Sequence, residues 1–263
     1  MHLLNAIEGS RSEYLAWYAL GTIGFCAPVP RQSDSFLSDF LVYLYEPRND
    51  TRVAPTGPAI LVQVKSNEDD ESFVEDRLAT LRDLELPYFR AVIDREGMLL
   101  RLFQTRERIS YRYHNYDKLT LRLGEAPVGY KGQPPEGILY LGKPIAEIDI
   151  GDLEKPECRT HFFGIMQKWA AIDLQVIGLN LLDLPVSLSV NYETNSDPHP
   201  ELLMRVHHND GVVNRATKGF LRVCHAQLGL LRLATRQGET GHDDAIRAIS
   251  ALLAVLPKPE EQK

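Results

Sequence analysis

The apolar run Ala59-Ile60-Leu61-Val62 leads directly into the polar sequence Gln63-Val64-Lys65-Ser66. A short apolar run of this kind is typical of a buried strand, and the polar residues mark the end of that strand. Because side chains alternate along a strand, Gln63 and Lys65 lie on the same face. The sequence therefore predicts a strand over residues 58–65 that presents an amide and an ammonium group where it ends.

Helical and strand-like segments alternate on both sides of this strand. Ser10 and Glu13 have the S-x-x-E spacing of a capping box, which predicts a first helix over residues 10–23. A second helix is expected over residues 72–84, and further strands over residues 25–29, 40–45, 88–93 and 98–103. The residues between 46 and 57 are expected to form a long loop. The order of helix, three strands, helix and two strands indicates an α/β fold.

The rest of the chain is expected to differ in character. We expect an α/β core over residues 1–125, a Gly- and Pro-rich connector over 126–157 and a mainly helical region over 158–263. In the last region, an apolar helix over 158–182 is expected either to be deeply buried or to form a homodimer interface. A strand pair near 186–192 and 202–207 and helices over 214–237 and 242–255 should follow it.

Composition narrows the classes of protein that this chain can belong to. Its 263 residues are 44% hydrophobic, which is enough for a core, yet no run of eighteen apolar residues indicates a membrane span. The N-terminus lacks a secretion signal, and three widely spaced cysteines indicate neither disulfides nor zinc, so we expect a cytoplasmic protein. A net charge of -7 argues against coating nucleic acid by bulk electrostatics.

Two of the carboxylates that precede the Gln63-Val64-Lys65 sequence are candidate partners for it. Asp39 stands immediately before the strand at residues 40–45, and Glu13 lies on the first helix. If these residues converge, Asp39, Gln63 and Glu13 supply oxygen ligands of the kind that Mg²⁺ or Mn²⁺ prefers. Lys65 would place a positive charge beside the attacking water or the phosphate. This set suits metal-dependent hydrolysis of a phosphodiester bond.

Each of these residues also has an ordinary structural interpretation. Glu13 can serve only the capping box, and Asp39 can merely begin a strand, with Asp34 as the competing ligand. A Q-x-K sequence is common on half-exposed strands, so its significance depends on the ordered set of Glu13, Asp39 and Gln63-Val64-Lys65.

In this order the residues resemble the PD-(D/E)XK nuclease superfamily, in particular its Mrr-like and Holliday-junction-resolvase-like branches, in which the third motif can read Q-x-K. The first hundred residues are also similar to an uncharacterised bacterial family with a core strand ending in Q-V-K-S. The resemblance implies a restriction-endonuclease-like αβββαβ core with catalytic Asp39, Gln63, Lys65 and Glu13. Gln63 departs from the acidic residue usual at its position, which removes one negative charge and should weaken metal affinity.

A basic stripe is expected on the helix over residues 214–237. Its residues recur at steps of three or four when His225 is counted and Gly229 fills the one gap. The positively charged members could follow a phosphate backbone: Arg215, Lys218, Arg222, Arg232 and Arg236. The alternative is an ordinary solvated face of an amphipathic helix.

Two functional hypotheses follow from the sequence. In the first, the protein is a metal-dependent DNA endonuclease of restriction, repair or defence type that acts on duplex or branched DNA. In the second, it is a catalytically inactive nuclease-fold scaffold that binds protein or nucleic acid within a defence or toxin-immunity system.

Overall fold

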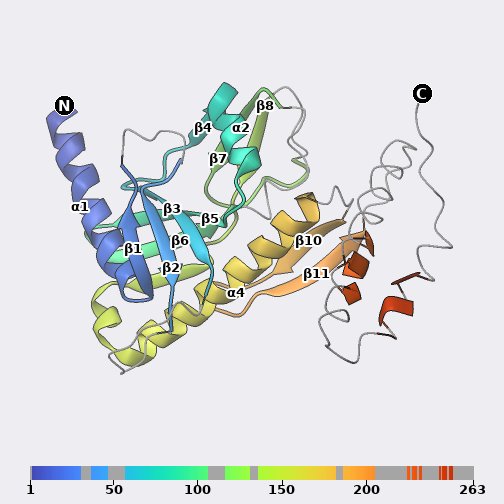
Figure 1. Cartoon of the computed structure of the whole chain (residues 1–263). Coiled ribbons are helices and arrows are strands. Elements are labelled where there is room, and N and C mark those ends of the chain that lie inside the picture. The colour runs from blue at the N-terminus through green and yellow to red at the C-terminus, as the bar shows by residue number, and fades with distance from the viewer. Residues whose placement is uncertain are drawn as a thin grey trace. The chain divides into compact units, whose positions relative to one another are not determined.

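The computed structural model describes residues 2–30, 37–46, 57–105, 116–130, 136–181 and 186–204, with scattered helical positions between 224 and 250. The chain divides into two compact units. The first comprises Met1–Ile177 and Leu188–Leu202, and the second comprises Gly178–Ser187 and Leu203–Lys263. Most of the described residues belong to the first unit (Figure 1).

The described elements alternate between helix and strand, which confirms a mixed α/β fold. In chain order they are α1 (His2–Gly21), β1 (Gly24–Pro28), β2 (Phe40–Leu44), β3 (Ala59–Lys65), β4 (Glu71–Val74), α2 (Glu75–Asp83), β5 (Tyr88–Asp94), β6 (Leu99–Gln104), β7 (Lys118–Arg122), β8 (Glu136–Tyr140), β9 (Ala146–Asp149), the 3₁₀ helix η2 (Gly151–Glu154), α4 (Pro156–Leu181), β10 (Val186–Asn191) and β11 (His199–Met204). The strands expected near 25–29, 40–45, 58–65, 88–93 and 98–103 are thus confirmed to within two residues.

A six-stranded sheet with the order β1-β2-β3-β5-β6-β9 forms the centre of the first unit. Every neighbouring pair is antiparallel except β3 and β5, which are parallel. Parallel neighbours need a crossover connection, and β4 with α2 supplies it. The crossover brings Gln63 of β3 opposite Arg90 of β5.

One face of this sheet packs against α1. Val42, Ile60 and Val62 are fully buried and alternate with residues of the other face. From α1, Ala16, Ala19 and Leu20 are fully buried, and the helix contacts β1, β2, β3 and β5. The small or aliphatic side chains of these three residues let the helix approach the sheet closely.

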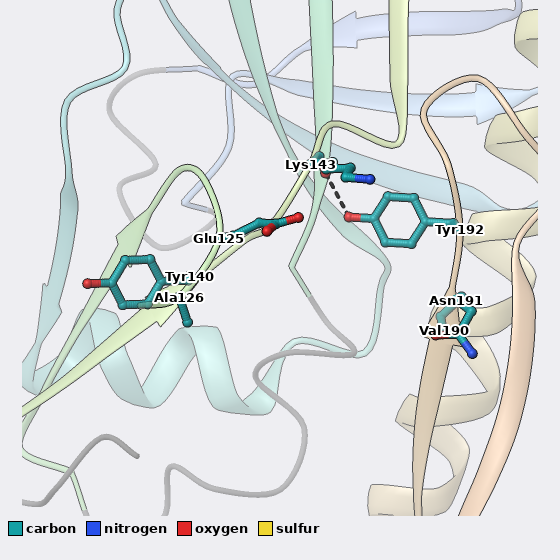
Figure 2. Close-up of a pocket in the computed structure, with 8 residues that line it drawn as sticks. Glu125, Ala126, Tyr140, Lys143, Val190, Asn191 and Tyr192 are labelled. Atoms are coloured by element: carbon teal, nitrogen blue, oxygen red, sulfur yellow. Dashed lines mark hydrogen bonds between the residues drawn. The ribbon is translucent and has the colours of Figure 1, made fainter. Parts of the chain in front are cut away.

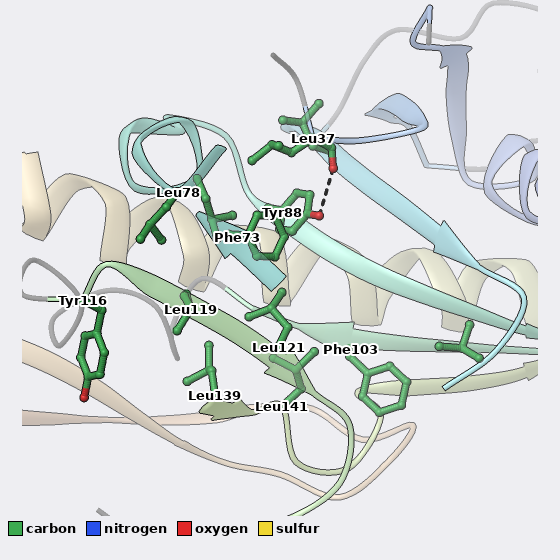
Figure 3. Close-up of a cluster of buried hydrophobic side chains, with 13 residues drawn as sticks. Leu37, Phe73, Leu78, Tyr88, Phe103, Tyr116, Leu119, Leu121, Leu139 and Leu141 are labelled. Carbon is green, nitrogen blue, oxygen red and sulfur yellow. Dashed lines mark hydrogen bonds between the residues drawn. The ribbon is translucent and has the colours of Figure 1, made fainter. Parts of the chain in front are cut away.

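The other face packs against a second sheet with the order β4-β7-β8 and against α2. Figure 3 shows the buried side chains that join these layers. The cluster consists of Leu37, Leu61, Phe73, Leu78, Leu81, Tyr88, Val92, Phe103, Tyr116, Leu119, Leu121, Leu139 and Leu141. Tyr88 also donates a hydrogen bond from its hydroxyl to the carbonyl of Leu37 at 3.0 Å, which ties β5 to the segment before β2.

Two expected helix starts are wrong. The first helix begins at His2, so Ser10 lies inside it and does not cap its N-terminus. The second begins at Glu75, because residues 71–74 pair with β7 as a strand instead. In that strand Glu71 and Phe73 are buried while Ser72 and Val74 are exposed, and this alternation suits a sheet rather than a helix.

The expected connector over residues 126–157 contributes to both sheets. It contains β8, β9 and η2, and β9 pairs with β6 along the edge of the six-stranded sheet. Buried and exposed residues alternate in β9, so its pattern is that of a half-buried strand.

The apolar helix is confirmed as α4, and Phe162, Met166 and Trp169 on it are buried. This burial accounts for its apolar faces. The strand pair after it is confirmed as β10 and β11. None of the helices in the described ranges has the length and apolar character that a bilayer crossing requires.

Candidate functional site

The structure brings Asp39 and Gln63 into contact. Asp39 immediately precedes β2, and its neighbour Phe40 lies opposite Val62 of β3. Its Oδ2 accepts one hydrogen bond from Gln63 Nε2 at 2.9 Å and another from the backbone N–H of Val64 at 2.7 Å. The carboxylate therefore sits at the end of the β2–β3 ladder, where two N–H donors hold it in place.

Lys65 lies two residues beyond Gln63 on the same face of β3 and is half-buried. Its Nζ is 3.3 Å from Glu71 Oε1, and the side chain of Lys65 is 32% exposed whereas that of Glu71 is 6% exposed. Arg77 Nη2 lies 3.6 Å from the same Glu71 oxygen. The lysine is thus held in an ion pair at the margin of the core.

Glu71 is a site residue that the sequence did not reveal, because it stands in an acidic segment between the strand expected over 58–65 and the helix expected over 72–84. It begins β4, and within the described residues its Oε2 is buried without a hydrogen-bond partner. The alternation of Glu71 and Phe73 with Ser72 and Val74 could have indicated that Glu71 points inward.

Arg90 is a second residue that the sequence did not reveal. It stands opposite Gln63 on β5 and is fully buried, with Nη1 donating to the Leu121 carbonyl at 3.3 Å and Nη2 donating to the Asp69 carbonyl. Burial lowers the pKa of Arg90, while the negative charge of Glu71 acts in the opposite direction. A buried guanidinium therefore belongs to the same sheet face as Gln63 and Lys65, on the neighbouring strand.

Tyr88 is buried in the same layer. Burial raises its pKa well above the ordinary tyrosine value, the charge of Glu71 adds to this effect and that of Asp39 contributes less. Its hydroxyl therefore stays protonated and acts as a hydrogen-bond donor to Leu37.

Glu13 lies on α1 and is half-buried, while α1 packs against the sheet face opposite to the one that carries Gln63 and Lys65. The role of Glu13 in the site stays a prediction. Asp34, the competing ligand, lies outside the described residues.

Among the described residues, no group of three or more His, Cys, Asp or Glu side chains is placed to hold a metal ion. The structure brings together two side chains that carry oxygen atoms, the carboxylate of Asp39 and the amide of Gln63, and the contact between them is made by the amide nitrogen Nε2. This set is small, but Mg²⁺ commonly takes only one or two protein carboxylates and completes its shell with water and substrate phosphate.

The described part of the chain also has a cavity of about 300 Å³ away from these residues (Figure 2). It is lined by Glu125, Ala126, Tyr140, Gly142, Lys143, Val190, Asn191 and Tyr192. The Tyr192 hydroxyl closes one side by donating to the Lys143 carbonyl at 2.7 Å. No residue of the expected catalytic set lines this cavity, so size alone does not identify the site.

Most of the expected basic stripe lies outside the described residues, namely Arg215, Lys218, Arg222 and Arg236. Arg232 is described as an exposed helical residue. A contact of this stripe with nucleic acid stays a prediction.

Comparisons of this chain with protein-family models, with curated proteins and with solved structures found no match.

Proposed function

We propose that this protein is a metal-dependent endonuclease that hydrolyses phosphodiester bonds in DNA. The observation that carries the proposal is the contact between Asp39 and Gln63, with Lys65 on the same strand face as Gln63. Asp39 and Gln63 come from distant positions in the chain and meet where β2 begins, and Lys65 is the last residue of β3.

The topology supports the same proposal. α1, the antiparallel strands β1, β2 and β3, then α2 and the parallel strand β5 follow the αβββαβ order that the PD-(D/E)XK resemblance implies. β4 is an addition to that order, and it lies in the second sheet. In this proposal the core is restriction-endonuclease-like, and β4 is the element that brings Glu71 to Lys65.

Asp39 and the amide oxygen of Gln63 would hold Mg²⁺ or Mn²⁺, with Glu13 as a further oxygen ligand. The bound ion would polarise the scissile phosphate and lower the pKa of a water molecule. Lys65 would place its ammonium group beside the phosphate, where it offsets developing negative charge. Glu71 would orient that ammonium group through their ion pair at 3.3 Å.

A second candidate function is that of a catalytically inactive scaffold, which binds protein or nucleic acid in a defence or toxin-immunity system. It is favoured by the same contacts, because Asp39 accepts two N–H donors and Lys65 pairs with Glu71. Both residues therefore have a structural role that needs neither metal nor substrate.

A cleavage assay separates the two functions. Supercoiled, single-stranded and branched DNA would be incubated with Mg²⁺ or Mn²⁺ and with the wild type, Asp39→Asn or Lys65→Met. We expect cleavage by the wild type and a loss of at least about 100-fold in each variant, the size expected when a charge-stabilising group is removed.

Two matched controls are available. Like Asp39, Asp94 accepts two N–H hydrogen bonds, in its case both from the backbone, of Glu96 and Gly97, each at 3.1 Å. Lys155 pairs with Asp152 at 2.6 Å. Asp94→Asn and Lys155→Met should therefore keep full activity. Cleavage that is absent in the wild type, or equal in all four variants, would favour the scaffold.

A further inference from the structure

Two large aromatic side chains are exposed on the sheet that carries the candidate site. Phe25 of β1 is 65% exposed and Tyr43 of β2 is 43% exposed. The residues beside them in the strands are buried on the opposite face, since Gly24, Cys26, Val42 and Leu44 alternate with them. Phe25 and Tyr43 are therefore not part of the core.

The strand register places both rings on the face that carries Gln63 and Lys65. Phe25 lies opposite Tyr43, and Tyr43 lies opposite Ala59 of β3. Directly opposed residues share a face, and so do residues at steps of two along one strand. Ala59, Leu61, Gln63 and Lys65 follow one another at steps of two along β3, so all four lie on the same face as Tyr43.

The aromatic pair is also near the site along the chain. Tyr43 stands four residues after Asp39, which corresponds to about 13 Å along an extended strand. A stacked nucleic-acid strand rises about 3.4 Å per nucleotide, so this separation spans about four nucleotides. By length, a strand whose phosphate lies at Asp39 and Lys65 can therefore place a base at Tyr43, provided that it passes over the segment that buries Leu61 between them.

Charge indicates which kind of substrate suits this surface. Binding to duplex DNA depends on many contacts between basic residues and phosphates, and this chain has a net charge of -7. Stacking of unpaired bases on aromatic rings contributes about 1–3 kcal/mol per base and tolerates any sequence, so this part of the affinity for a single strand does not come from basic residues. In a duplex the base faces are already stacked, so the rings can be used only by unpaired bases.

We propose that Phe25 and Tyr43 form a stacking platform for unpaired bases, so that the substrate is single-stranded or locally unpaired DNA. This inference rests on the proposed nuclease function, because that function places a DNA strand on this sheet face.

The test is a binding measurement that requires no cleavage. Fluorescence anisotropy with EDTA present would follow a labelled oligothymidylate of about 20 nucleotides, which has no secondary structure, and a duplex of equal length. We expect the wild type to prefer the single strand, and Phe25→Ala and Tyr43→Ala each to weaken its binding about fivefold or more. Phe25→Trp, which keeps a stacking ring, should retain wild-type affinity.

Tyr14→Ala is the matched control, because Tyr14 is 67% exposed but lies on α1, which covers the opposite sheet face. It should leave binding unchanged. The proposal is overturned if the wild type does not bind the oligothymidylate, or if the Ala variants at positions 25 and 43 bind as tightly as the wild type. It is also overturned if sedimentation shows a dimer that these two variants dissociate, since a second copy would then cover the rings.

The binding and cleavage assays fail independently. Cleavage without an effect of Phe25 or Tyr43 on binding would retain the nuclease and remove the platform. Binding that depends on both rings, without cleavage by the wild type, would retain the platform on a scaffold that binds single strands and would remove the nuclease.

Discussion

At the scale of single residues, the candidate site is built around buried charge. Glu71 contacts Lys65 and Arg77 at its exposed side, and its charge also acts on the buried guanidinium of Arg90. Arg90 in turn donates to two backbone carbonyls, those of Asp69 and Leu121. A charge this deep is stable only because these partners replace the water that it loses.

Replacement of Arg90 should therefore lower the free energy of unfolding. Arg90→Met keeps a long side chain, but it removes the donors to two carbonyls and the positive charge that acts on the buried carboxylate of Glu71. We expect a loss of about 2–4 kcal/mol in the free energy of unfolding. Urea denaturation measures it. Arg101→Met is the control on the neighbouring strand, because Arg101 pairs at 2.6 Å with Glu68, whose side chain is 58% exposed. It should change stability by about 0.5 kcal/mol or less. Equal losses in both variants would contradict this account of Arg90.

Cys26 gives a prediction about pH at the same scale. Burial raises the pKa of its thiol to about 12. The thiolate is the reactive form, so alkylation of Cys26 in the folded protein should be very slow at pH 8 and should still rise about tenfold per pH unit between pH 8 and 10. Peptide mass spectrometry after timed labelling would follow it, with the half-buried Cys158 as an internal reference. A labelling rate for Cys26 that levels off near pH 9 would show that burial does not control its ionisation.

At the scale of elements, a side chain is hydrogen-bonded to the backbone of each edge strand of the six-stranded sheet. At the β1 edge, the Trp17 indole donates to the Cys26 carbonyl at 3.1 Å. At the β9 edge, Asn195 pairs with both backbone groups of Glu147: its Oδ1 accepts from the N–H and its Nδ2 donates to the carbonyl, each at 2.8 Å. Exposed strand edges invite pairing with other chains, and these contacts reduce that hazard.

Asn195 is suited to its position by backbone as well as side chain. Its φ is 61°, a value that asparagine tolerates better than most residues. Asn195→Gly should lose the two side-chain hydrogen bonds at a cost of about 1–3 kcal/mol. Asn195→Ala should cost about 1 kcal/mol more, because only alanine pays for the positive φ. Thermal unfolding of both variants measures the difference, and an alanine variant at least as stable as the glycine variant would contradict it.

At the scale of the whole molecule, the site depends on segments that are distant in sequence. Asp39 precedes β2, Gln63 and Lys65 end β3, and Glu71 begins β4 in the second sheet. The buried cluster between the sheets, which includes Phe73 and Tyr88, holds these segments together (Figure 3). The site therefore exists only when both layers are packed.

Metal binding should be visible in the stability of the whole fold. A ligand that binds only the folded state at ten times its dissociation constant stabilises that state by about 1.4 kcal/mol, or about 3–6 °C for a chain of this size. We expect such a rise in melting temperature with excess Mn²⁺, and none in Asp39→Asn. Asp94→Asn should keep the rise, because within the described residues the Asp94 carboxylate is hydrogen-bonded to the turn after β5. A rise that persists in Asp39→Asn would place the metal elsewhere.

The sequence by itself determined five of the six strands of the central sheet and the shared face of Gln63 and Lys65, because apolar runs and two-residue alternation are local properties. It did not determine the start of either helix. The capping pattern at Ser10 lies inside α1, and residues 71–74 form a strand because β7 offers backbone partners there. Residues 146–149, within the expected connector, likewise form strand β9 because β6 offers backbone partners at the sheet edge.

Only the tertiary structure decided which charges meet. The parallel pairing of β3 with β5 places Arg90 opposite Gln63 on the same sheet face, and the pairing of β4 with β7 places Glu71 beside Lys65. Neither contact has a local sequence signal, because each depends on strands that pair across long stretches of chain. Periodicity indicates which face of a strand is buried, but the energy of a buried charge depends on neighbours that arrive from elsewhere in the fold.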